Sequence, residues 1–523
     1  MKKKLLALFI AVLLAFTALI GCDANKTDVL DNTDGAVISG NGSFLVEKGD
    51  YVYFINGQDA TTSDNTFGTP VKSSLVRVKK SDLAKPSEAT VETVIPKIIL
   101  TGNYATGVYF YGEYVYYATP CSDKDKTGTV QNSKTEFNRF NLTTGKADKA
   151  IAIVDDNTAQ FKYVEKGDKV YLYYTFTETV DETTENKVKV IDATNGDEVY
   201  TSPAYLSVAL PEDSSSTLLF VKKAFSKNLD QDESFNELYA YTVGDEDAKL
   251  VLSGAGSYAL GRDDRLENLT PDQLLTESGI EGVTMSLIKN TGKLAIFKAT
   301  TLDSNYASNM YFGAELENGG FKANSLVKLG DSNVHIDAAI TATSYYESLT
   351  DIYYVDSEKY GLMKFDYTKA SNNEFGTEII STDCKNLSIS FIEGNYMYLC
   401  NTSEGIYYRA NYKDTDIKVK KINAISMQTS TSFYLPRVIG NYFIGSYSQE
   451  AYYKYVYVID MTDIDVEKED GEELSKYEKY LEDTAVESRE TLVALNKTLL
   501  GKMADADKEL FDTYLDTNYP EEE

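Results

Sequence analysis

The cysteine at position 22 is the residue whose surroundings indicate a specific chemistry most clearly. It stands after an apolar run, Leu5 to Ile20, which itself follows three lysines, Lys2 to Lys4. A basic start followed by a short apolar run is typical of a secretory signal peptide. The small residue Gly21 suits the pocket of a signal peptidase, and the thiol of Cys22 is the nucleophile that would take up a diacylglyceryl group. The pattern predicts a signal peptide over residues 1–21 and lipid attachment at Cys22, with an ordinary cleaved signal as the alternative.

The segment from Leu19 to Cys22, which reads LIGC, resembles the lipobox of bacterial lipoproteins. The resemblance implies a mature protein on the outer, extracytoplasmic leaflet of a bacterial cell membrane, held by its N-terminal lipid. Two acyl chains anchor a protein stably, whereas one chain is marginal. No later stretch reaches the roughly 18 apolar residues that indicate a membrane-spanning helix, so the lipid is the only predicted anchor. Residues 22–36 are polar and rich in turn formers, and we expect them to be a tether.

The charge of the chain restricts its partners. It has 51 Lys and Arg against 81 Asp and Glu, a formal net charge of −30 over 523 residues. Cleavage before Cys22 removes three lysines and makes the mature charge −33. Because binding to a phosphate backbone depends on Lys and Arg, no nucleic-acid partner is expected. A surface of this sign would not lie flat on anionic lipid and would attract basic partners or divalent cations.

The other residue types offer little for catalysis. Three further cysteines, Cys121, Cys384 and Cys400, allow one disulfide in an exported protein, or none. A single histidine excludes a site built from several imidazoles. The segment that begins at Asp123 resembles the start of a calcium-binding loop, but Lys134 stands where the bidentate Glu is needed. Because no catalytic constellation stands out, we expect no catalytic residues, no metal and no other cofactor.

A repeat supplies the elements that would position any site. A turn, usually Gly-Asp or Gly-Asn, leads into a Tyr-rich strand such as Tyr51 to Phe54, and a second strand with a basic residue follows, such as Ser74 to Val78. Period-two alternation and the abundance of Tyr, Val, Ile and Phe indicate half-buried strands. In the fifth copy the second strand is expected at Ser325 to Leu329. The eight copies begin at or near Gly49, Gly112, Gly167, Thr217, Gly292, Asp351, Gly394 and Gly440.

The spacing of the copies, roughly 56 residues, is that of a four-stranded propeller blade with a longer loop. The G-[DN]-Y-[VM]-Y strand and the L-x-[RK] strand after it resemble a Tyr-rich β-propeller domain family of bacterial surface lipoproteins, distantly similar to the YWTD propellers of low-density-lipoprotein receptors. The chain departs from that pattern in its fourth copy, which lacks the Gly, and in having no Trp. We expect an all-β fold over residues 37–462, a single β-propeller of about eight four-stranded blades, with seven as the alternative.

Two segments depart from the repeat. Residues 256–281 interrupt it, and Thr270 to Gln273 has the form of a capping box with Pro at the first helical position, which predicts a short helix. Residues 463–523 hold 20 acidic and 7 basic residues, with Leu474, Tyr477 and Leu481 at helical spacing. We expect an acidic, amphipathic α-helical tail there, with a solvated tail as the alternative.

The connections between the second and third strands of all blades emerge on one face of the ring. They are expected to span roughly 12–27 residues in blades one to five and about 3–8 in blades six to eight, and unusually long loops are often functional. Apolar rings on such loops suit a binding rim, although they would also suit packing onto the blade tops. The candidate rim consists of Phe67, Phe176, Phe225, Tyr306, Tyr311 and Phe312.

These features favour a non-catalytic binding or scaffold protein, lipid-anchored and extracytoplasmic, that docks a protein or an envelope polysaccharide at the long-loop face. The alternative is a propeller hydrolase or lyase acting on extracellular glycan. Clustered carboxylates in a deep central channel would support the enzyme, and a shallow face would support binding.

Overall fold

The structure is a computed structural model that describes most of residues 38–461. The longer segments outside the described residues are 1–37, 57–73, 101–107, 121–133, 226–233, 255–282, 302–308, 332–337, 423–432 and 462–523. The predicted signal peptide, lipid site, helical insertion and helical tail therefore lie outside the described residues. Within the described ranges no helix is long and apolar enough to cross a membrane.

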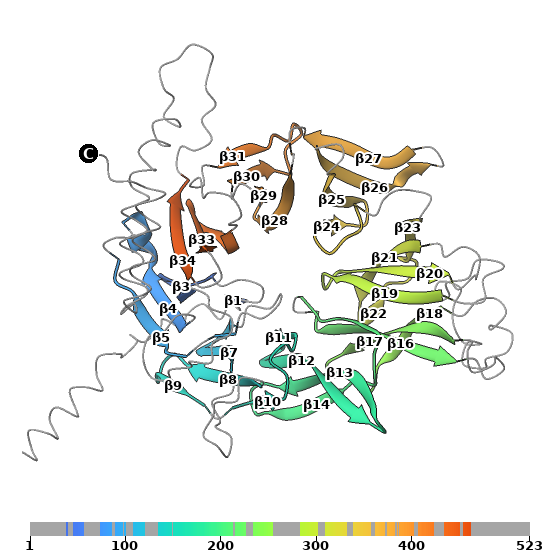
Figure 1. Cartoon of the computed structure of the whole chain (residues 1–523), viewed down its shortest axis with the longest axis horizontal. Helices are drawn as coiled ribbons and strands as arrows, with labels where there is room; N and C mark the ends of the chain where they lie inside the picture. The colour runs from blue at the N-terminus through green and yellow to red at the C-terminus, as the bar shows by residue number, and fades with distance from the viewer. Residues whose placement is uncertain are drawn as a thin grey trace, which may run out of the picture.

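The described strands form eight sheets, one for each copy of the repeat, together with a single short 3-10 helix η1 (Lys80–Ala84). Adjacent strands within each sheet are antiparallel, and strand order follows chain order in most sheets (Figure 1). The all-β propeller predicted from the sequence is confirmed. Seven of the sheets have at least four strands, and the last has three described strands.

The first sheet consists of β2 (Leu45–Lys48), β3 (Tyr51–Asn56), β4 (Ser74–Lys79) and β5 (Glu92–Ile95), and the second of β6 (Val108–Tyr111), β7 (Tyr114–Pro120), β8 (Thr135–Asn141), β9 (Lys146–Ala147) and β10 (Ala152–Val154), with β1 (Ile38–Ser39) beside β6. The third sheet consists of β11 (Phe161–Lys166), β12 (Lys169–Val180), β13 (Thr183–Asp192) and β14 (Asp197–Thr201). The fourth consists of β15 (Ser207–Ala209), β16 (Thr217–Phe225), β17 (Ser234–Thr242) and β18 (Lys249–Ser253).

The fifth sheet consists of β19 (Val283–Asn290), β20 (Leu294–Thr301), β21 (Asn309–Glu317), β22 (Gly320–Phe321) and β23 (Val327–Asp331), and the sixth of β24 (Tyr345–Ser348), β25 (Asp351–Asp356), β26 (Gly361–Ser371) and β27 (Glu374–Ser381). The seventh sheet consists of β28 (Leu387–Glu393), β29 (Tyr396–Asn401), β30 (Ile406–Asn411) and β31 (Lys420–Ile422). The eighth consists of β32 (Phe433–Ile439), β33 (Tyr442–Gln449) and β34 (Tyr453–Asp460).

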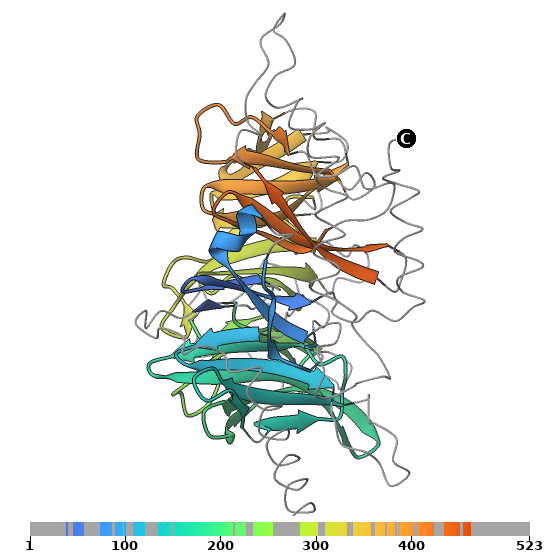
Figure 2. The same cartoon turned by 90° about the vertical axis from the view of Figure 1, so that its left-hand side faces the viewer.

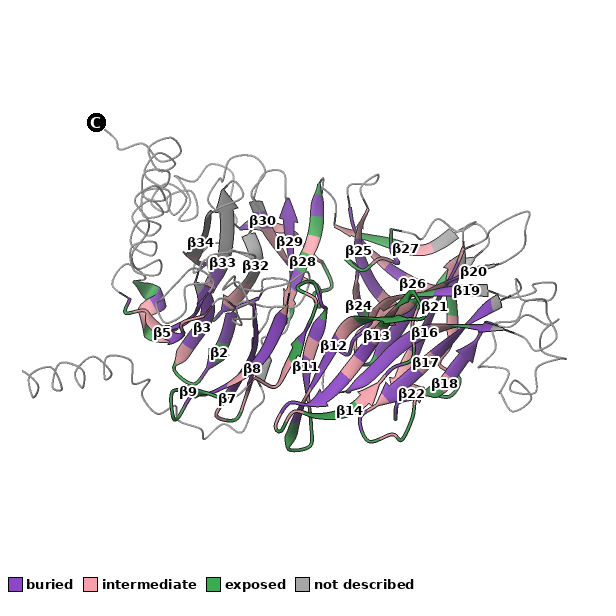
Figure 3. Ribbon diagram, turned by 60° about the horizontal axis from the view of Figure 1, so that its bottom comes forward, coloured by how far each residue is buried: buried purple, intermediate pink, exposed green. Residues whose placement is uncertain are grey.

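Packing between neighbouring sheets closes the ring. One buried cluster contains Val52 on β3, Val115 on β7 and Ile444 on β33, and so joins the first sheet to the second and to the last. The rings of Phe391 on β28 and Phe443 on β33 lie 6.3 Å apart and join the last two sheets. Figure 2 shows the first sheet between β32–β34 and β6–β8. Burial of both faces explains why Tyr, Val and Ile dominate these strands, and exposed residues concentrate at turns and hairpin tips (Figure 3).

The Gly turn joins the first strand of a sheet to the second, as the sequence predicts. Lys48 pairs with Tyr51, so Gly49 and Asp50 form a two-residue hairpin turn. Gly49 has φ of 57°, which side chains rarely adopt and which suits the first central position of a II′ turn. The fourth copy, which lacks the Gly, has Ser216 at φ of 53° before its second strand.

The basic residue of the repeat stacks on the Tyr-rich strand. Arg77 on β4 is fully buried, and its Cζ lies 4.1 Å from the centroid of the Tyr51 ring. Its Nε donates a hydrogen bond to Glu92 Oε2 at 2.7 Å. Cation–π contact and ion pairing together explain why a cation recurs at this position. The same stacking occurs for Arg139 over Tyr114, Arg409 over Tyr396 and Lys364 over Tyr353, at 4.4, 4.8 and 6.0 Å.

The fifth copy differs from the prediction in one strand. The strand that pairs with β20 is β21, and the segment expected in that place contributes the outer strand β23. Tyr311 and Phe312 therefore lie inside β21, with 6% and 8% of their surface exposed. Because neighbouring side chains on a strand point to opposite faces, Tyr311 packs toward β24–β27 and Phe312 toward β15–β18. Both residues were expected on a long loop, and the structure places them in a buried strand instead.

Several long-loop predictions are wrong for a related reason. β12 and β13 extend for 12 and 10 residues, so only Asp181 and Glu182 connect them. In the fifth sheet β21 begins at Asn309, which leaves 302–308 as the connection. Residues assigned to loops lengthen the strands instead. The connection between β3 and β4, residues 57–73, remains long.

Candidate functional site

The remaining rim candidates do not gather into one surface among the described residues. Phe67 and Tyr306 lie outside the described residues, and Phe225 is the last residue of β16. Phe176 on β12 is partly buried against the core between its own sheet and β6–β10, and Lys189 Nζ lies 5.4 Å from the centroid of its ring. Phe176 thus packs onto its blade, which is the alternative that the sequence left open.

A polar hollow lies at the opposite end of the strands, between the sheets β24–β27 and β28–β31. Its volume is about 580 Å³. It is bounded by the turn between β24 and β25 and by the turn after β30. In antiparallel sheets these turns and the predicted rim lie on opposite faces, and we call the face with the hollow the turn face. The hollow is lined by Glu347, Ser348, Asp351, Tyr353, Lys364, Glu378, Ile380, Tyr412, Lys413, Asp414, Thr415 and Ile417.

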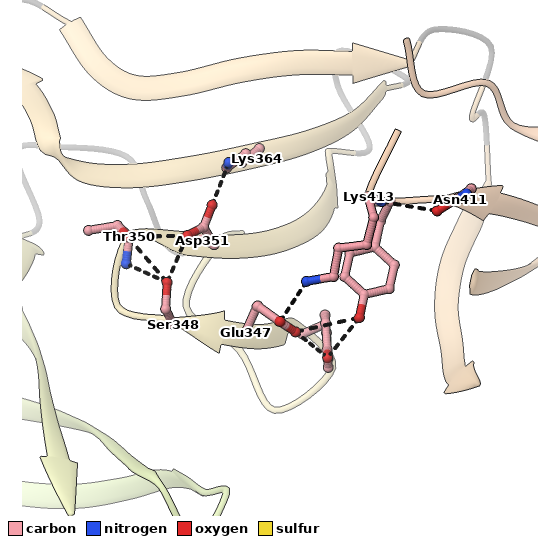
Figure 4. A network of polar contacts seen from close by, with 9 residues as sticks. Glu347, Ser348, Thr350, Asp351, Lys364, Asn411 and Lys413 are labelled. Carbon is pink, nitrogen blue, oxygen red and sulfur yellow. Dashed lines mark hydrogen bonds and ion pairs between the residues drawn. The ribbon is translucent and has the colours of Figure 1, made fainter. Parts of the chain in front are cut away.

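Glu347 joins the two sheets that form this hollow, which we call the Glu347 hollow. Its Oε1 lies 2.6 Å from Lys413 Nζ, which comes from the neighbouring sheet (Figure 4). The hydroxyl of Tyr345 donates to Glu347 Oε2 at 2.6 Å, and the hydroxyl of Tyr412 donates to the same oxygen at 3.5 Å. Lys413 Nζ also lies 4.6 Å from the centroid of the Tyr412 ring. The ammonium group is therefore held by a carboxylate and an aromatic face.

Asp351 holds a second ammonium group in the Glu347 hollow in a similar way. It pairs with Lys364 on the adjacent strand, and it accepts hydrogen bonds from Ser348 Oγ at 2.8 Å and Thr350 Oγ1 at 3.2 Å (Figure 4). Lys364 Nζ lies 6.0 Å from the centroid of the Tyr353 ring. Ser348 at the end of β24 and Thr350 in the turn that follows thus supply two hydroxyl groups that orient the Asp351 carboxylate.

Both carboxylates remain ionised at neutral pH. The hydrogen bonds from Lys413 and Tyr345 lower the pKa of Glu347. Burial opposes ionisation of Asp351, but the hydrogen bonds from Lys364 and Ser348 outweigh it and lower the pKa of Asp351. The partner carboxylates raise the pKa of both Lys413 and Lys364. Groups with fixed charges suit the binding of a polar ligand, whereas a general acid needs a raised pKa.

A second hollow, of about 420 Å³, lies on the turn face between β15–β18 and β19–β23. Asp245 lines it and pairs with Lys249 Nζ at 2.8 Å. Gly319 lines it too, with φ of 78°, and a Cβ there would lie 2.7 Å from Thr242 Oγ1. The turn face therefore has polar hollows in two places.

The remaining chemistry candidates contribute no site in the described part of the chain. Cys384 and Cys400 are both buried, and no disulfide joins them, although the sequence allowed one. Cys121 and the Asp123 loop lie outside the described residues. Among the residues that the structure places, no three His, Cys, Asp or Glu side chains gather in a way that could hold a metal ion.

Sequence reasoning missed the Glu347 hollow. It identified Asp351 as the start of a copy of the repeat, but gave it no role in a site. Glu347 and Lys413 are 66 positions apart and meet only because neighbouring sheets pack side by side. The charged turn that begins at Lys413 was the available signal in the sequence.

No protein-family model matches the chain, and no curated protein matches it. Among solved structures, the chain is similar to the β-propeller domain of the Trilobed protease from Pyrococcus furiosus, at 9% identity and a TM-score of 0.32, over 80% of this chain and 95% of that chain. It is similar to AztD from Citrobacter koseri, at 9% identity and a TM-score of 0.33, over 75% and 95% of the two chains. Prolyl oligopeptidase B from Galerina marginata has 10% identity and a TM-score of 0.39, over 67% and 47%. At these sequence identities and TM-scores, the similarities do not indicate a function for this chain.

Proposed function

We propose that this chain is a non-catalytic binding or scaffold protein of the bacterial cell envelope, held by lipid at Cys22 on the outer leaflet of the membrane. Its partner, a protein or an envelope polysaccharide, docks on the turn face at the Glu347 hollow. The anchor is supported by the basic start, the apolar run and the LIGC sequence. The docking face differs from the long-loop face that the sequence favoured, because Tyr311 and Phe312 are buried inside β21.

The observation that carries the binding function is the arrangement of fixed charges in the Glu347 hollow. Its volume of about 580 Å³ lies within the range of small-ligand and side-chain pockets, roughly 300–1,000 Å³. Glu347 and Asp351 present oriented acceptors, and Lys413 and Lys364 present oriented donors. Because the pKa values of the two carboxylates are lowered, these groups keep their charges when a partner binds. A prearranged polar wall of this kind favours recognition over proton transfer.

The alternative, a glycan hydrolase or lyase, has one observation in its favour. Glu393, at the end of β28, keeps contact with solvent, yet the protein packed around it raises its pKa. A raised pKa is what a general acid for glycoside cleavage needs. Its charged neighbours are Arg437, which opposes the shift, and Glu47, which adds to it. If Glu393 were that acid, Glu393→Gln would abolish release of reducing sugar from envelope glycan and leave capture of the glycan intact.

The binding function is tested by filling the hollow without touching its ion pairs. Thr415 is exposed and lines the Glu347 hollow, so Thr415→Trp places a large ring in the space. The lipidated mature chain is immobilised and mixed with solubilised envelope fractions, and bound protein and bound polysaccharide are quantified separately. We expect the variant to lose most of the capture, at least tenfold, while its melting temperature stays within about 2 °C of the parent.

The matched control is Thr179→Trp, which adds the same ring to an exposed position on β12, on the opposite face. It should capture as much partner as the parent. Equal capture by Thr415→Trp and the parent would place the binding surface elsewhere and contradict the proposal.

A further inference from the structure

We infer that the Glu347 hollow binds a primary ammonium group on an aliphatic stem, the side chain of a lysine in a basic partner protein. This inference rests on the proposed binding function and names the chemistry that the hollow recognises. It also selects a protein over a polysaccharide as the partner.

The first observation is that the hollow already holds two ammonium groups of the chain itself. Lys413 lies 2.6 Å from a carboxylate oxygen of Glu347 and 4.6 Å from the centroid of the Tyr412 ring. Lys364 pairs with Asp351 and lies 6.0 Å from the centroid of the Tyr353 ring. A carboxylate beside an aromatic face is a favourable seat for an alkylammonium ion. The walls are therefore built for this kind of group.

The second observation is the charge balance of the lining. Four carboxylates line the hollow, and Lys364 and Lys413 are its only lining cations in the described chain. Glu378 lies across from Lys364 on the next strand, and Asp414 accepts a hydrogen bond from Asn411 Nδ2 at 2.9 Å. Neither Glu378 nor Asp414 forms an ion pair with a described residue, and both are exposed. The hollow thus retains two negative charges that a partner's cations can neutralise.

The third observation is apolar surface beside these charges. Ile380 and Ile417 line the same hollow and are partly buried. Lys side chains bury their methylene stems along apolar surface while the charged head stays polar. A lysine of a partner can lay its stem along these isoleucines and direct its ammonium group to Glu378 or Asp414.

An anionic ligand fits this arrangement poorly. Each lining lysine is already paired with a carboxylate, and the lining carries a net charge of −2 from its four acids and two lysines. The mature chain carries −33 overall, which repels anions and raises the local concentration of cations.

The test uses a synthetic pentalysine peptide as the probe, titrated calorimetrically into the full mature chain in neutral detergent micelles. The same peptide with all lysine side chains acetylated is the neutral probe. We expect pentalysine to bind and the acetylated peptide to bind at least tenfold more weakly. Glu378→Gln with Asp414→Asn should weaken pentalysine binding about tenfold, because two ion pairs at an exposed surface are lost.

The control variant removes two charges at a distance from the hollow, Asp181→Asn with Glu182→Gln at the tip of the β12–β13 hairpin. It should change pentalysine binding by less than about twofold. Equal weakening by the two double variants would mean that the peptide responds only to overall charge, and would overturn the inference. Equal binding of the acetylated peptide and pentalysine would overturn the inference as well. So would binding of neutral maltotetraose, but not of pentalysine, that Thr415→Trp abolishes.

The two proposals fail in different ways. If Thr415→Trp abolishes capture from the envelope while pentalysine does not bind the hollow, the binding function stands and the ligand class is wrong. If pentalysine binds the hollow while Thr415→Trp leaves envelope capture unchanged, the ammonium site stands and the proposed docking function is wrong.

Discussion

Replacing Arg77 with methionine tests the physical basis of the repeat. Arg77 is fully buried, its Nη2 lies 2.6 Å from Glu92 Oε2, and its guanidinium stacks on Tyr51. Methionine keeps much of the volume and the apolar stem, so the loss is mainly polar. A hydrogen bond to a charged group contributes about 1.5–3 kcal/mol, and the cation–π contact about 0.5–1 kcal/mol.

These contributions are reduced by the exposure of the partner. The Glu92 side chain is 36% exposed, so water can solvate it once the guanidinium is gone. The hydroxyl of Tyr53, which accepts a hydrogen bond from Arg77 Nη1 at 3.4 Å, would lose a buried partner. We expect Arg77→Met to lower the free energy of unfolding by about 3 kcal/mol.

Urea unfolding followed by circular dichroism measures this change, with Arg139→Met as the comparison. Arg139 also stacks on a Tyr and pairs with Asp148, but its side chain is 20% exposed and that of Asp148 is 41% exposed. The Arg139 variant should therefore cost about half as much. A loss below about 0.5 kcal/mol for Arg77→Met, or a larger loss for Arg139→Met, would refute the reasoning.

Four further predictions concern other parts of the chain. Cys22→Ala should stop fatty-acid labelling in cells and leave unprocessed precursor, and continued labelling would show that the anchor lies elsewhere. Glu182→Gly should raise the free energy of unfolding by about 0.5–1 kcal/mol, since Glu182 has φ of 66° in the hairpin turn, and destabilisation would contradict this. Gly319→Ala should lower the free energy of unfolding by about 2–3 kcal/mol, because its Cβ would lie 2.7 Å from Thr242 Oγ1 and because position 319 has φ of 78°. Adding Thr242→Ala to this variant should restore part of the lost stability. Burial opposes ionisation of Asp192, but its hydrogen bonds outweigh burial and lower its pKa, so Asp192→Asn should lower the free energy of unfolding above about pH 4. This loss of stability relative to the parent should shrink as the pH falls through the folded-state pKa of Asp192. A loss of equal size at pH 3 would refute the assignment.

The fold could be predicted from the sequence because its signals are local and repeated. Gly49 and its equivalents require a backbone conformation that few other residues adopt, and each marks a hairpin turn. The Tyr-rich strand and the basic strand after it need each other, as Arg77 and Tyr51 show. Eight copies of the same local signal indicate a ring even where one copy, such as that at Thr217, is weak.

Strand lengths could not be predicted in the same way. Thr177 to Val180 are polar or exposed, so nothing in their hydrophobic pattern distinguishes a protruding hairpin from a loop. In the fifth copy, two segments fit the strand pattern, and packing against β20 selected Asn309 to Glu317. The sequence pattern placed the strand at Ser325 to Leu329 and left Tyr311 and Phe312 on a loop, so they were assigned to a rim.

The candidate site depends on contacts between different sheets. Glu347, Lys413 and Tyr412 belong to neighbouring blades, and no spacing along the chain relates them. Each of them has an ordinary place in its own repeat. Their common role becomes visible only when the sheets are placed side by side.

The central claim is that the partner docks on the turn face at the Glu347 hollow, and hydrogen exchange of the captured complex tests it most directly. Amide exchange is compared between the free mature chain and the chain bound to its envelope partner. We predict slower exchange at residues 345–353 and 411–417 in the complex, with the β12–β13 hairpin, residues 175–186, unchanged. Protection confined to that hairpin or to the β3–β4 connection, residues 57–73, would contradict the account.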